Sequence, residues 1–274
     1  MSAVVVENLE KSYDGQPIIE SIDLDIASGS FVTIVGASGC GKSTFLRMLL
    51  GQEQPTHGRI MVDGEPLPDE PSPERGIVFQ RYSVFPHLSV LDNVILGLEF
   101  MAAPWTGRLF GRQRRQAEQE AERMIEAVGL DHVRDARPAS LSGGMQQRLA
   151  IAQALILKPK ILLLDEPFGA LDPGIRDDMH ALMTDLWRET GMTVFMVTHD
   201  LREAFKLGTR VLTFDKIRHD PHAPEAYGAT ITYDLEGRQR RAGSEPQPAD
   251  LTEASEQDGV THDDQPDPPP ASAA

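Results

Sequence analysis

A glycine-rich loop between an apolar run and a helical segment is the feature that most constrains how this chain folds. Residues 36–44 read Gly-Ala-Ser-Gly-Cys-Gly-Lys-Ser-Thr, which contains the pattern Gly-x-x-x-x-Gly-Lys-Ser. The run 31–35, Phe-Val-Thr-Ile-Val, predicts a buried strand that leads into the loop, and 44–50 has helical character and stops at Gly51. Because this strand–loop–helix order is the context that a phosphate-binding loop requires, it is favoured over an ordinary glycine turn.

The residue types of this loop suit a nucleotide triphosphate. Its glycines allow the backbone to curl so that successive N–H groups point at phosphate oxygens, and the helix start adds the positive end of a dipole. Lys42 supplies a cation for the β- and γ-phosphates, and the hydroxyl of Ser43 is expected to ligate Mg²⁺. The residues predicted to hold the nucleotide are Gly36, Ala37, Ser38, Gly39, Cys40, Gly41, Lys42, Ser43 and Thr44.

Two carboxylates follow a second predicted strand. The uninterrupted apolar run 161–164 is typical of a buried parallel strand, and Asp165 and Glu166 come directly after it. Because strand ends in such sheets open on the ligand crevice, Asp165 is expected to hold Mg²⁺ and Glu166 to orient the attacking water. An Asp-Glu pair alone is a weak signal, and Glu166 capping a loop is the alternative; the phosphate loop upstream favours the catalytic interpretation.

Three further polar or aromatic residues are candidates for the same site. His199 follows the strand 193–197 by two residues and is predicted to hydrogen-bond the γ-phosphate, although a lone histidine is more often surface or core filler. Gln80 ends the strand 76–79, and its amide can reach the metal or the attacking water. Tyr13 is predicted to stack on adenine, with a half-buried sheet tyrosine as the competing interpretation.

A second glycine motif lies about a hundred residues after the first. Residues 141–148 read Leu-Ser-Gly-Gly-Met-Gln-Gln-Arg and open a predicted helix. This helix start is a second anion-binding element, and it has no evident function in a single phosphate-loop domain. The two motifs together suggest that ATP lies between two copies of the chain.

Strands and helices alternate along the chain, which predicts an α/β fold. Helical character dominates residues 81–157, interpreted as a helical insertion, and no internal repeat suggests a second copy of the domain. Residues 103–115 are interpreted as a connecting loop with a basic cluster on the solvated surface, and contact with lipid headgroups is the alternative. Other expected elements are β-prone runs within 4–25, strands at 58–64, 210–214 and 229–233, a loop at 66–73, and helices at 173–190 and from about residue 201.

Charge and composition limit the class of protein. The net charge is −16, and residues 242–274 contain eight acidic and no basic residues, so the Pro-rich stretch 237–274 is predicted to be a disordered acidic tail. This balance argues against a nucleic-acid partner. We expect no membrane span, because no apolar run approaches the roughly 20 residues needed, and no secretory signal. The single cysteine fits a reducing cytosol.

Residues 4 to about 220 resemble the ATP-binding cassette family, which carries the motifs above together with 170–172 (Ala-Leu-Asp) and 198–200 (Thr-His-Asp) in the same order. The resemblance implies a P-loop NTPase core with a mostly parallel sheet, an N-terminal antiparallel β subdomain and a helical subdomain at about 81–157, within a domain spanning 1–236. It implies a head-to-tail homodimer that sandwiches ATP. The residues that would act across the dimer interface are Ser142, Gly143 and Gly144, which contact the partner's γ-phosphate, and Asp172. One departure from the family pattern is Met145, where many members carry Gln.

The sequences of residues 166–172 and 141–148 resemble those of the ATPase subunits of bacterial importers. More narrowly, they are similar to the nitrate/sulfonate/taurine group of these importers. This resemblance implies separate transmembrane permease subunits, a solute-binding protein as an indirect partner, and a place at the cytoplasmic face of the plasma membrane. The permease would contact residues 81–93, where Tyr82, Val84, Phe85 and Leu88 are candidate anchors, unless they pack inside the helical subdomain. The region 219–235 is less standard, and His219 and His222 are interpreted as loop residues rather than metal ligands.

Two other classes of function remain as alternatives. A soluble cassette protein of translation or DNA maintenance usually carries two cassettes or a long coiled coil, and neither is visible here. A phosphate-loop kinase or GTPase leaves residues 141–148 without a role. The cargo stays open among nitrate, sulfonates, taurine and small nitrogen compounds.

Overall fold

The computed structural model describes residues 3–79, 84–103, 105, 107–218 and 226–236, which belong to one compact unit. Its centre is a six-stranded sheet in which every neighbouring pair is parallel except the pair at one edge. The strand order across this sheet is β10 (Thr230–Glu236), β9 (Arg210–Asp215), β3 (Phe31–Gly36), β8 (Thr193–Val197), β7 (Ile161–Asp165) and β6 (Arg75–Val78). This mostly parallel α/β sheet confirms the predicted fold class.

A second sheet is entirely antiparallel and lies in the N-terminal part of the chain. Its strand order is β2 (Gln16–Ile26), β1 (Val4–Tyr13), β4 (His57–Val62) and β5 (Glu65–Pro66). The expected short β-prone runs within 4–25 are therefore two long paired strands. In β2 the buried residues Ile22, Leu24 and Ile26 alternate with exposed Asp23 and Asp25, the pattern of a strand with one face on a core.

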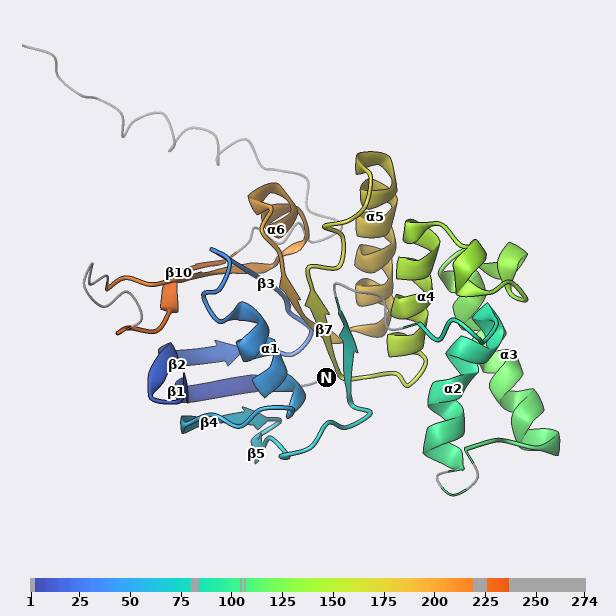
Figure 1. The fold of residues 1–274 in the computed structure, drawn as a ribbon, viewed down its shortest axis with the longest axis horizontal. Coiled ribbons are helices and arrows are strands. Elements are labelled where there is room, and N and C mark those ends of the chain that lie inside the picture. The colour runs from blue at the N-terminus through green and yellow to red at the C-terminus, as the bar shows by residue number, and fades with distance from the viewer. Residues whose placement is uncertain (1–2, 80–83, 104, 106, 219–225, 237–274) are drawn as a thin grey trace, which may run out of the picture. The chain divides into compact units, whose positions relative to one another are not determined.

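Six α-helices flank these sheets in the described chain (Figure 1). They are α1 (Lys42–Leu50), α2 (Val90–Ala102), α3 (Gly111–Ala127), α4 (Gly143–Leu155), α5 (Pro173–Thr190) and α6 (Leu201–Leu207), with 3-10 turns at Asp131–Val133 and Pro138–Ser140. The expected helical insertion thus contains α2, α3 and α4. Helix α1 begins two residues earlier than predicted, at Lys42. None of the described helices is both long and apolar enough to span a bilayer.

The alternation of side chains along β7 separates two hydrophobic cores. Ile161 and Leu163 pack with α1 and the antiparallel sheet. Leu162 and Leu164 pack on the other face with α4 and α5. Helix α1 therefore lies on one face of the parallel sheet and α4 on the opposite face, because successive residues of a strand point to opposite sides.

The edge strand β10 begins one residue later than the predicted strand 229–233 and ends three residues later. It pairs antiparallel with β9, and Arg210 contacts Asp234 through two bonds, Nε to Oδ1 at 2.7 Å and Nη2 to Oδ2 at 2.6 Å. At its start, the backbone N–H of Glu20 donates to the carbonyl of Ala229 at 2.9 Å. These contacts attach the end of the described chain to both sheets. The region beyond, including the predicted acidic tail at 237–274, lies outside the described residues, as do His219 and His222.

Candidate nucleotide-binding site

Three neighbouring strands deliver the predicted site residues to one edge of the sheet. Strand β8 lies between β3 and β7, and all three are parallel. The loop 36–44 follows β3, Asp165 and Glu166 end β7, and His199 follows β8 by two residues. The carboxyl ends of parallel strands meet at the same edge, so these groups lie at one edge of the sheet.

The phosphate loop carries a nearly buried cation whose hydrogen-bond partners are neutral. The ammonium of Lys42, which is 7% exposed, donates to the carbonyls of Gly36 at 2.8 Å and Ala37 at 2.7 Å. None of the described ion pairs involves Lys42. Because a buried charge is costly without an opposite charge, the geometry favours binding of an anion here.

The glycine that precedes this lysine cannot carry a side chain. Gly41 caps α1 with φ +87°, and a Cβ there would lie 2.9 Å from Cγ1 of Ile19. Ala37, Ser38 and Gly39 are exposed, whereas Cys40 is buried with its sulfur 3.7 Å from the Lys42 ammonium. The loop thus presents open backbone at its tip while its base is packed against β2.

Ser43 and Asp165 meet across 122 residues of sequence. The Ser43 hydroxyl donates to Oδ1 of Asp165 at 3.2 Å. Burial raises the pKa of Asp165, and the hydrogen bond from Ser43 and the charge of Arg47 oppose that shift. A hydroxyl and a carboxylate side by side form the oxygen donor set that suits a hard divalent cation.

Glu166 and His199 form a pair at the ends of β7 and β8. The side-chain oxygen Oε2 of Glu166 lies 3.6 Å from Nδ1 of His199, whose side chain is 66% exposed. Glu166 has a φ of +47°, and its N–H donates to the carbonyl of Val197 at 3.0 Å. A non-glycine residue in this region of φ is uncommon, and the β8 hydrogen bond holds it there.

Tyr13 ends β1 beside the phosphate loop. The Tyr13 hydroxyl donates to Oε2 of Glu53, and the Lys11 ammonium lies over one ring face, 4.9 Å from its centre. Burial and the hydrogen bond with Glu53 raise the pKa of Tyr13. The ring is 40% exposed, so it is available at the surface for stacking on adenine, which stays a prediction. No motif in the sequence indicated Glu53 as the hydrogen-bond partner of Tyr13.

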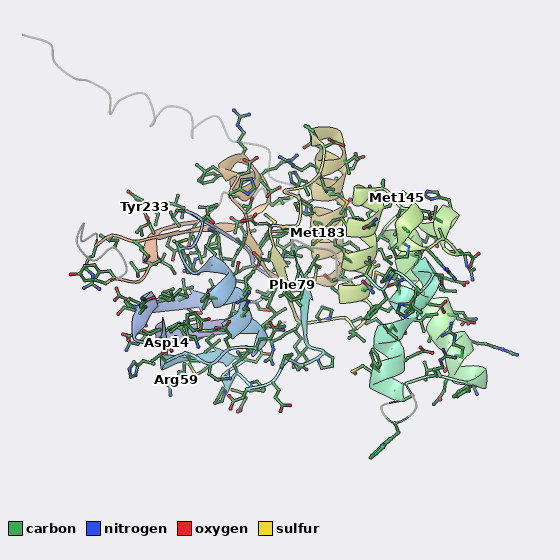
Figure 2. All side chains as sticks on the ribbon, viewed as in Figure 1. Asp14, Arg59, Phe79, Met145, Met183 and Tyr233 are labelled. Carbon is green, nitrogen blue, oxygen red and sulfur yellow. The ribbon has the colours of Figure 1, made fainter. Side chains whose placement is uncertain are left out.

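The second glycine motif opens α4 on the other face of the sheet. The Ser142 hydroxyl accepts from the N–H of Met145 at 3.3 Å and caps the helix. Ser142 and Gly143 are exposed, whereas Gly144 is buried. Figure 2 shows Met145, beside this motif, far across the parallel sheet from Asp14, the neighbour of Tyr13. Within one chain, the structure therefore does not bring the two glycine motifs together.

Gly144 lies against α5 with no room for a side chain. A Cβ at Gly144 would lie 2.5 Å from Cγ2 of Ile175, in the first turn of α5. That turn follows Asp172, which is exposed and precedes the helix as its N-cap. The sequence did not indicate a role for Ile175, because a contact between two helices leaves no pattern in the local sequence.

We expect Gly144→Ala to destabilise the fold by about 1–3 kcal/mol through overpacking against Ile175, measured as a lower midpoint of thermal unfolding. Gly174→Ala is the matched control, because nothing lies within 4 Å of its added methyl group. Gly144→Ala combined with Ile175→Ala should be less destabilised than the sum of the two single changes. Strict additivity of the two would show that the contact does not limit the approach of α4 to α5.

A buried hydrogen bond and an arginine tie α5 to α6. Nε2 of His180 lies 2.7 Å from Oε1 of Glu203, and both side chains are almost inaccessible. The Arg176 guanidinium donates to the carbonyl of Leu171 at 3.1 Å and lies 3.7 Å from Oδ2 of Asp200. These contacts join the turn before Asp172 to the turn that follows His199. Of these side chains, the sequence indicated only Asp200, as part of the motif 198–200, because the partners are far apart in the chain.

Part of the predicted site lies outside the described residues. This part contains Gln80, Arg81 and Tyr82. Of the other candidate anchors, Val84 is partly buried against the core, Leu88 is half-buried, and Phe85 is 41% exposed.

The segment after residue 84 is organised by a buried asparagine. The side chain of Asn93, 1% exposed, accepts from the N–H of Phe85 at 2.8 Å and donates to the carbonyls of Phe85 at 3.1 Å and Ser89 at 2.8 Å. Nε2 of Gln153 on α4 donates to Oδ1 of Asn93 at 3.1 Å. The segment is thereby coupled to the helix that the second glycine motif opens.

Comparison with known sequences identifies one family. Residues 19–169 match the ABC transporter family. The spermidine/putrescine import ATP-binding protein PotA of Bacillus anthracis is 42% identical over 215 residues, which cover 78% of this chain and 63% of that protein. PotA of Marinobacter nauticus is 42% identical over 209 residues, which cover 76% of this chain and 54% of that protein. The chain therefore spans less than two thirds of the length of these relatives.

Solved structures with the same fold are ABC cassettes. A dimeric post-hydrolysis state of the ATP-binding cassette MJ0796 bound to ADP and Pi matches with a TM-score of 0.67 and 32% identity, over 86% of this chain and 99% of that one. CbiO1 of Clostridium perfringens, part of the ABC transporter complex cbiONQ, matches with a TM-score of 0.70 and 26% identity, over 85% of this chain and 88% of that one. The family match covers more than half of the 274 residues and includes both glycine motifs and Asp165–Glu166, so the chain belongs to the ABC transporter family.

Proposed function

We propose that this chain is the ATP-binding and ATP-hydrolysing subunit of an importer, and that two copies close on two ATP molecules. The observation that carries the proposal is the separation of the two glycine motifs. Helix α1, with the phosphate loop, packs on one face of the parallel sheet, and α4, with exposed Ser142 and Gly143, packs on the other. A second copy in head-to-tail orientation supplies the missing motif to each phosphate loop, as a closed two-fold dimer allows.

The site residues take the following roles. Lys42 and the N–H groups of residues 36–44 bind the phosphates, and Tyr13 stacks on adenine. Glu166 orients the attacking water, and His199 hydrogen-bonds the γ-phosphate while held beside Glu166. Because phosphoryl transfer depends mainly on positioning and charge stabilisation, this set accounts for hydrolysis without a covalent step on the protein.

Magnesium fits the donor set at this site. Ser43 and Asp165 would hold it, together with Gln80. Bound there, Mg²⁺ would neutralise the charge on the β- and γ-phosphate oxygens. Among the described residues no cluster of three or more His, Cys, Asp or Glu could enclose a metal. That agrees with Mg²⁺, which usually binds one or two protein oxygens and completes its shell with phosphate and water.

Asp165→Asn is expected to abolish Mg²⁺-dependent hydrolysis while leaving the metal-free protein as stable as the parent or more stable. Burial raises the pKa of Asp165, so its ionised form is disfavoured in the fold. That unfavourable contribution grows as pH rises through the ordinary and the raised pKa and is absent below both. The thermal midpoint of the variant minus that of the parent, measured without Mg²⁺, should therefore increase from acid to neutral pH. Asp178→Asn, at an exposed site on α5, is the matched control.

The test of the shared site is complementation between two inactive variants. Lys42→Ala disables the phosphate loop, and Ser142→Arg places a bulky cation at the start of α4. In a mixed dimer, one of the two sites is built from two intact parts. The Ser142→Arg chain supplies its phosphate loop, and the Lys42→Ala chain supplies its α4. Mixing the two proteins should restore ATP hydrolysis that neither shows alone. If each chain forms its site alone, every mixture stays inactive.

Separate permease subunits complete the proposed transporter, and they contact the surface around residues 81–93. A cavity of about 620 Å³ borders this segment, lined by Phe85, His87 and Leu88 together with residues of α2 and the α2–α3 connection. Aromatic side chains at the mouth of a cavity are typical anchors of an interface. The chain would then act at the cytoplasmic face of the membrane, with a solute-binding protein as an indirect partner.

The cargo is the least constrained part of the proposal. The relatives named above are spermidine/putrescine import proteins, and their names support a small nitrogen compound among the predicted cargoes. They do not support the predicted similarity to the nitrate/sulfonate/taurine group. Because the permease and the solute-binding protein carry the cargo site, transport assays with the neighbouring permease genes are the experiment that identifies it.

A further inference from the structure

The connection between α2 and α3 exposes an unusual number of large apolar side chains. Trp105 is 98% exposed, Phe110 71%, Phe100 59% and Met101 55%. Isolated exposed apolar residues are normal, whereas four within eleven positions are unusual, and two of them, Phe100 and Phe110, line the same cavity. We name these four residues, together with Arg108, Arg112 and Arg115, the tip surface.

The tip surface is also basic in an acidic protein. Residues 100–115 contain four arginines and no Asp or Glu, although the whole chain carries −16. Arg114 is neutralised locally, because its guanidinium contacts Asp92 at 2.8 Å, Glu99 at 2.9 Å and Glu118 at 2.9 Å. Arg112 and Arg115 are exposed, and neither belongs to the described ion pairs. The charge that remains is therefore positive and faces solvent.

The connection is held in place at its base. Glu99, 8% exposed, accepts from the N–H of Leu109 at 3.3 Å and from Arg114, and Leu109 is buried. The N–H of Gly107 donates to the carbonyl of Ala103 at 2.7 Å. These contacts fix the two ends of the connection, so the exposure of Phe110 and Phe100 follows from the packed structure around them.

The tip surface continues from the segment proposed to meet the permease. The lining of the 620 Å³ cavity includes Phe85, His87 and Leu88 together with Phe100, Arg108 and Phe110. If a permease binds at Phe85, as the proposed function requires, this end of α2 and α3 is directed toward the membrane. Tryptophan and arginine together are the residues that favour the boundary between lipid headgroups and water.

We infer that the tip surface binds the anionic headgroup layer of the bilayer, with Trp105 inserted at the interface and Arg112 and Arg115 on lipid phosphates. This inference rests on the proposed function for the orientation of the chain, and its chemistry is independent of nucleotide. Each arginine near an anionic membrane surface contributes about five-fold in binding. Screening confines that attraction to within a Debye length of the surface.

The test uses the full chain and vesicles of phosphatidylcholine with or without phosphatidylglycerol. Co-sedimentation should occur only with the anionic vesicles at low salt and should be lost at high salt. Arg112→Gln combined with Arg115→Gln should weaken binding roughly 25-fold. Arg123→Gln combined with Arg188→Gln removes the same charge from exposed sites on α3 and α5 and should leave binding unchanged.

Tryptophan fluorescence reports the insertion directly. The chain has two tryptophans, and Trp187 is half-buried, with its indole N–H donating to the carbonyl of Gly29 at 3.0 Å. Anionic vesicles should shift the emission to shorter wavelength, and Trp105→Ala should abolish the shift. ATP hydrolysis without vesicles should be unchanged in all these variants. Unchanged hydrolysis shows that the variants are folded. It also separates a failure of membrane binding from a failure of the proposed function.

Three results would overturn the inference: no vesicle binding at low salt, equal binding to neutral vesicles, or equal loss of binding in the Arg123/Arg188 control. Binding only to vesicles that contain the permease, weakened by the tip variants, would assign the surface to the permease instead.

Discussion

Glu166→Gln is expected to lose nearly all ATP hydrolysis while still binding ATP. The amide keeps the size of the side chain but carries no charge to orient and polarise water, and positioned acid–base groups contribute about 10²–10⁴-fold to such reactions. Phosphate binding stays intact, because Lys42 and the loop 36–44 are separate from Glu166. The measurement compares single-turnover phosphate release with equilibrium binding of ATP.

The same variant should accumulate as a dimer in MgATP, since the nucleotide that closes the two copies is no longer consumed. A near-complete shift of the population from monomer to closed dimer requires that ATP bind the closed form more favourably by about 5.5 kcal/mol. Because the dimer has two shared sites, each bound ATP supplies a part of that free energy. Sedimentation of the variant with ATP and with ADP tests this. Glu126→Gln, an exposed site on α3, is the control. A Glu166→Gln protein that stays monomeric at saturating MgATP would contradict the shared site.

Lys42→Ala is expected to lose nucleotide binding itself. Hydrogen bonds to charged groups contribute about 1.5–3 kcal/mol each, so affinity for ATP should fall roughly 10- to 150-fold. Affinity for adenosine should change far less, because Tyr13 is unaltered. The variant removes a nearly buried cation that belongs to none of the described ion pairs, so the nucleotide-free protein should not be destabilised by the loss of an ion pair.

Calorimetric titration with ATP, ADP and adenosine gives these affinities. Lys158→Ala is the matched control, because its ammonium contacts only Glu120 at the surface. If Lys42→Ala weakened ATP and adenosine equally, Lys42 would be supporting the fold of the loop and not the phosphates.

Contiguous motifs indicated most of the candidate site residues. The phosphate loop, Asp165, Glu166 and His199 each follow a predicted strand, and the carboxyl ends of neighbouring parallel strands coincide. The order of strands along the chain likewise predicted the α/β class. The N-terminal strands were harder, because β1 and β2 are long and paired, whereas their sequence shows only short β-prone runs.

The sequence by itself determined the candidate phosphate-binding residues, because the glycine, lysine and hydroxyl groups of a phosphate loop must follow one another at fixed spacing in a single turn. Only the tertiary structure decided that α1 and α4 lie on opposite faces of the sheet, that Gly144 rests on Ile175, and that Phe100 and Phe110 are exposed on one surface. These facts depend on how distant segments pack around two cores. Packing between distant segments is governed by the shape and burial of the whole fold, which no local pattern contains.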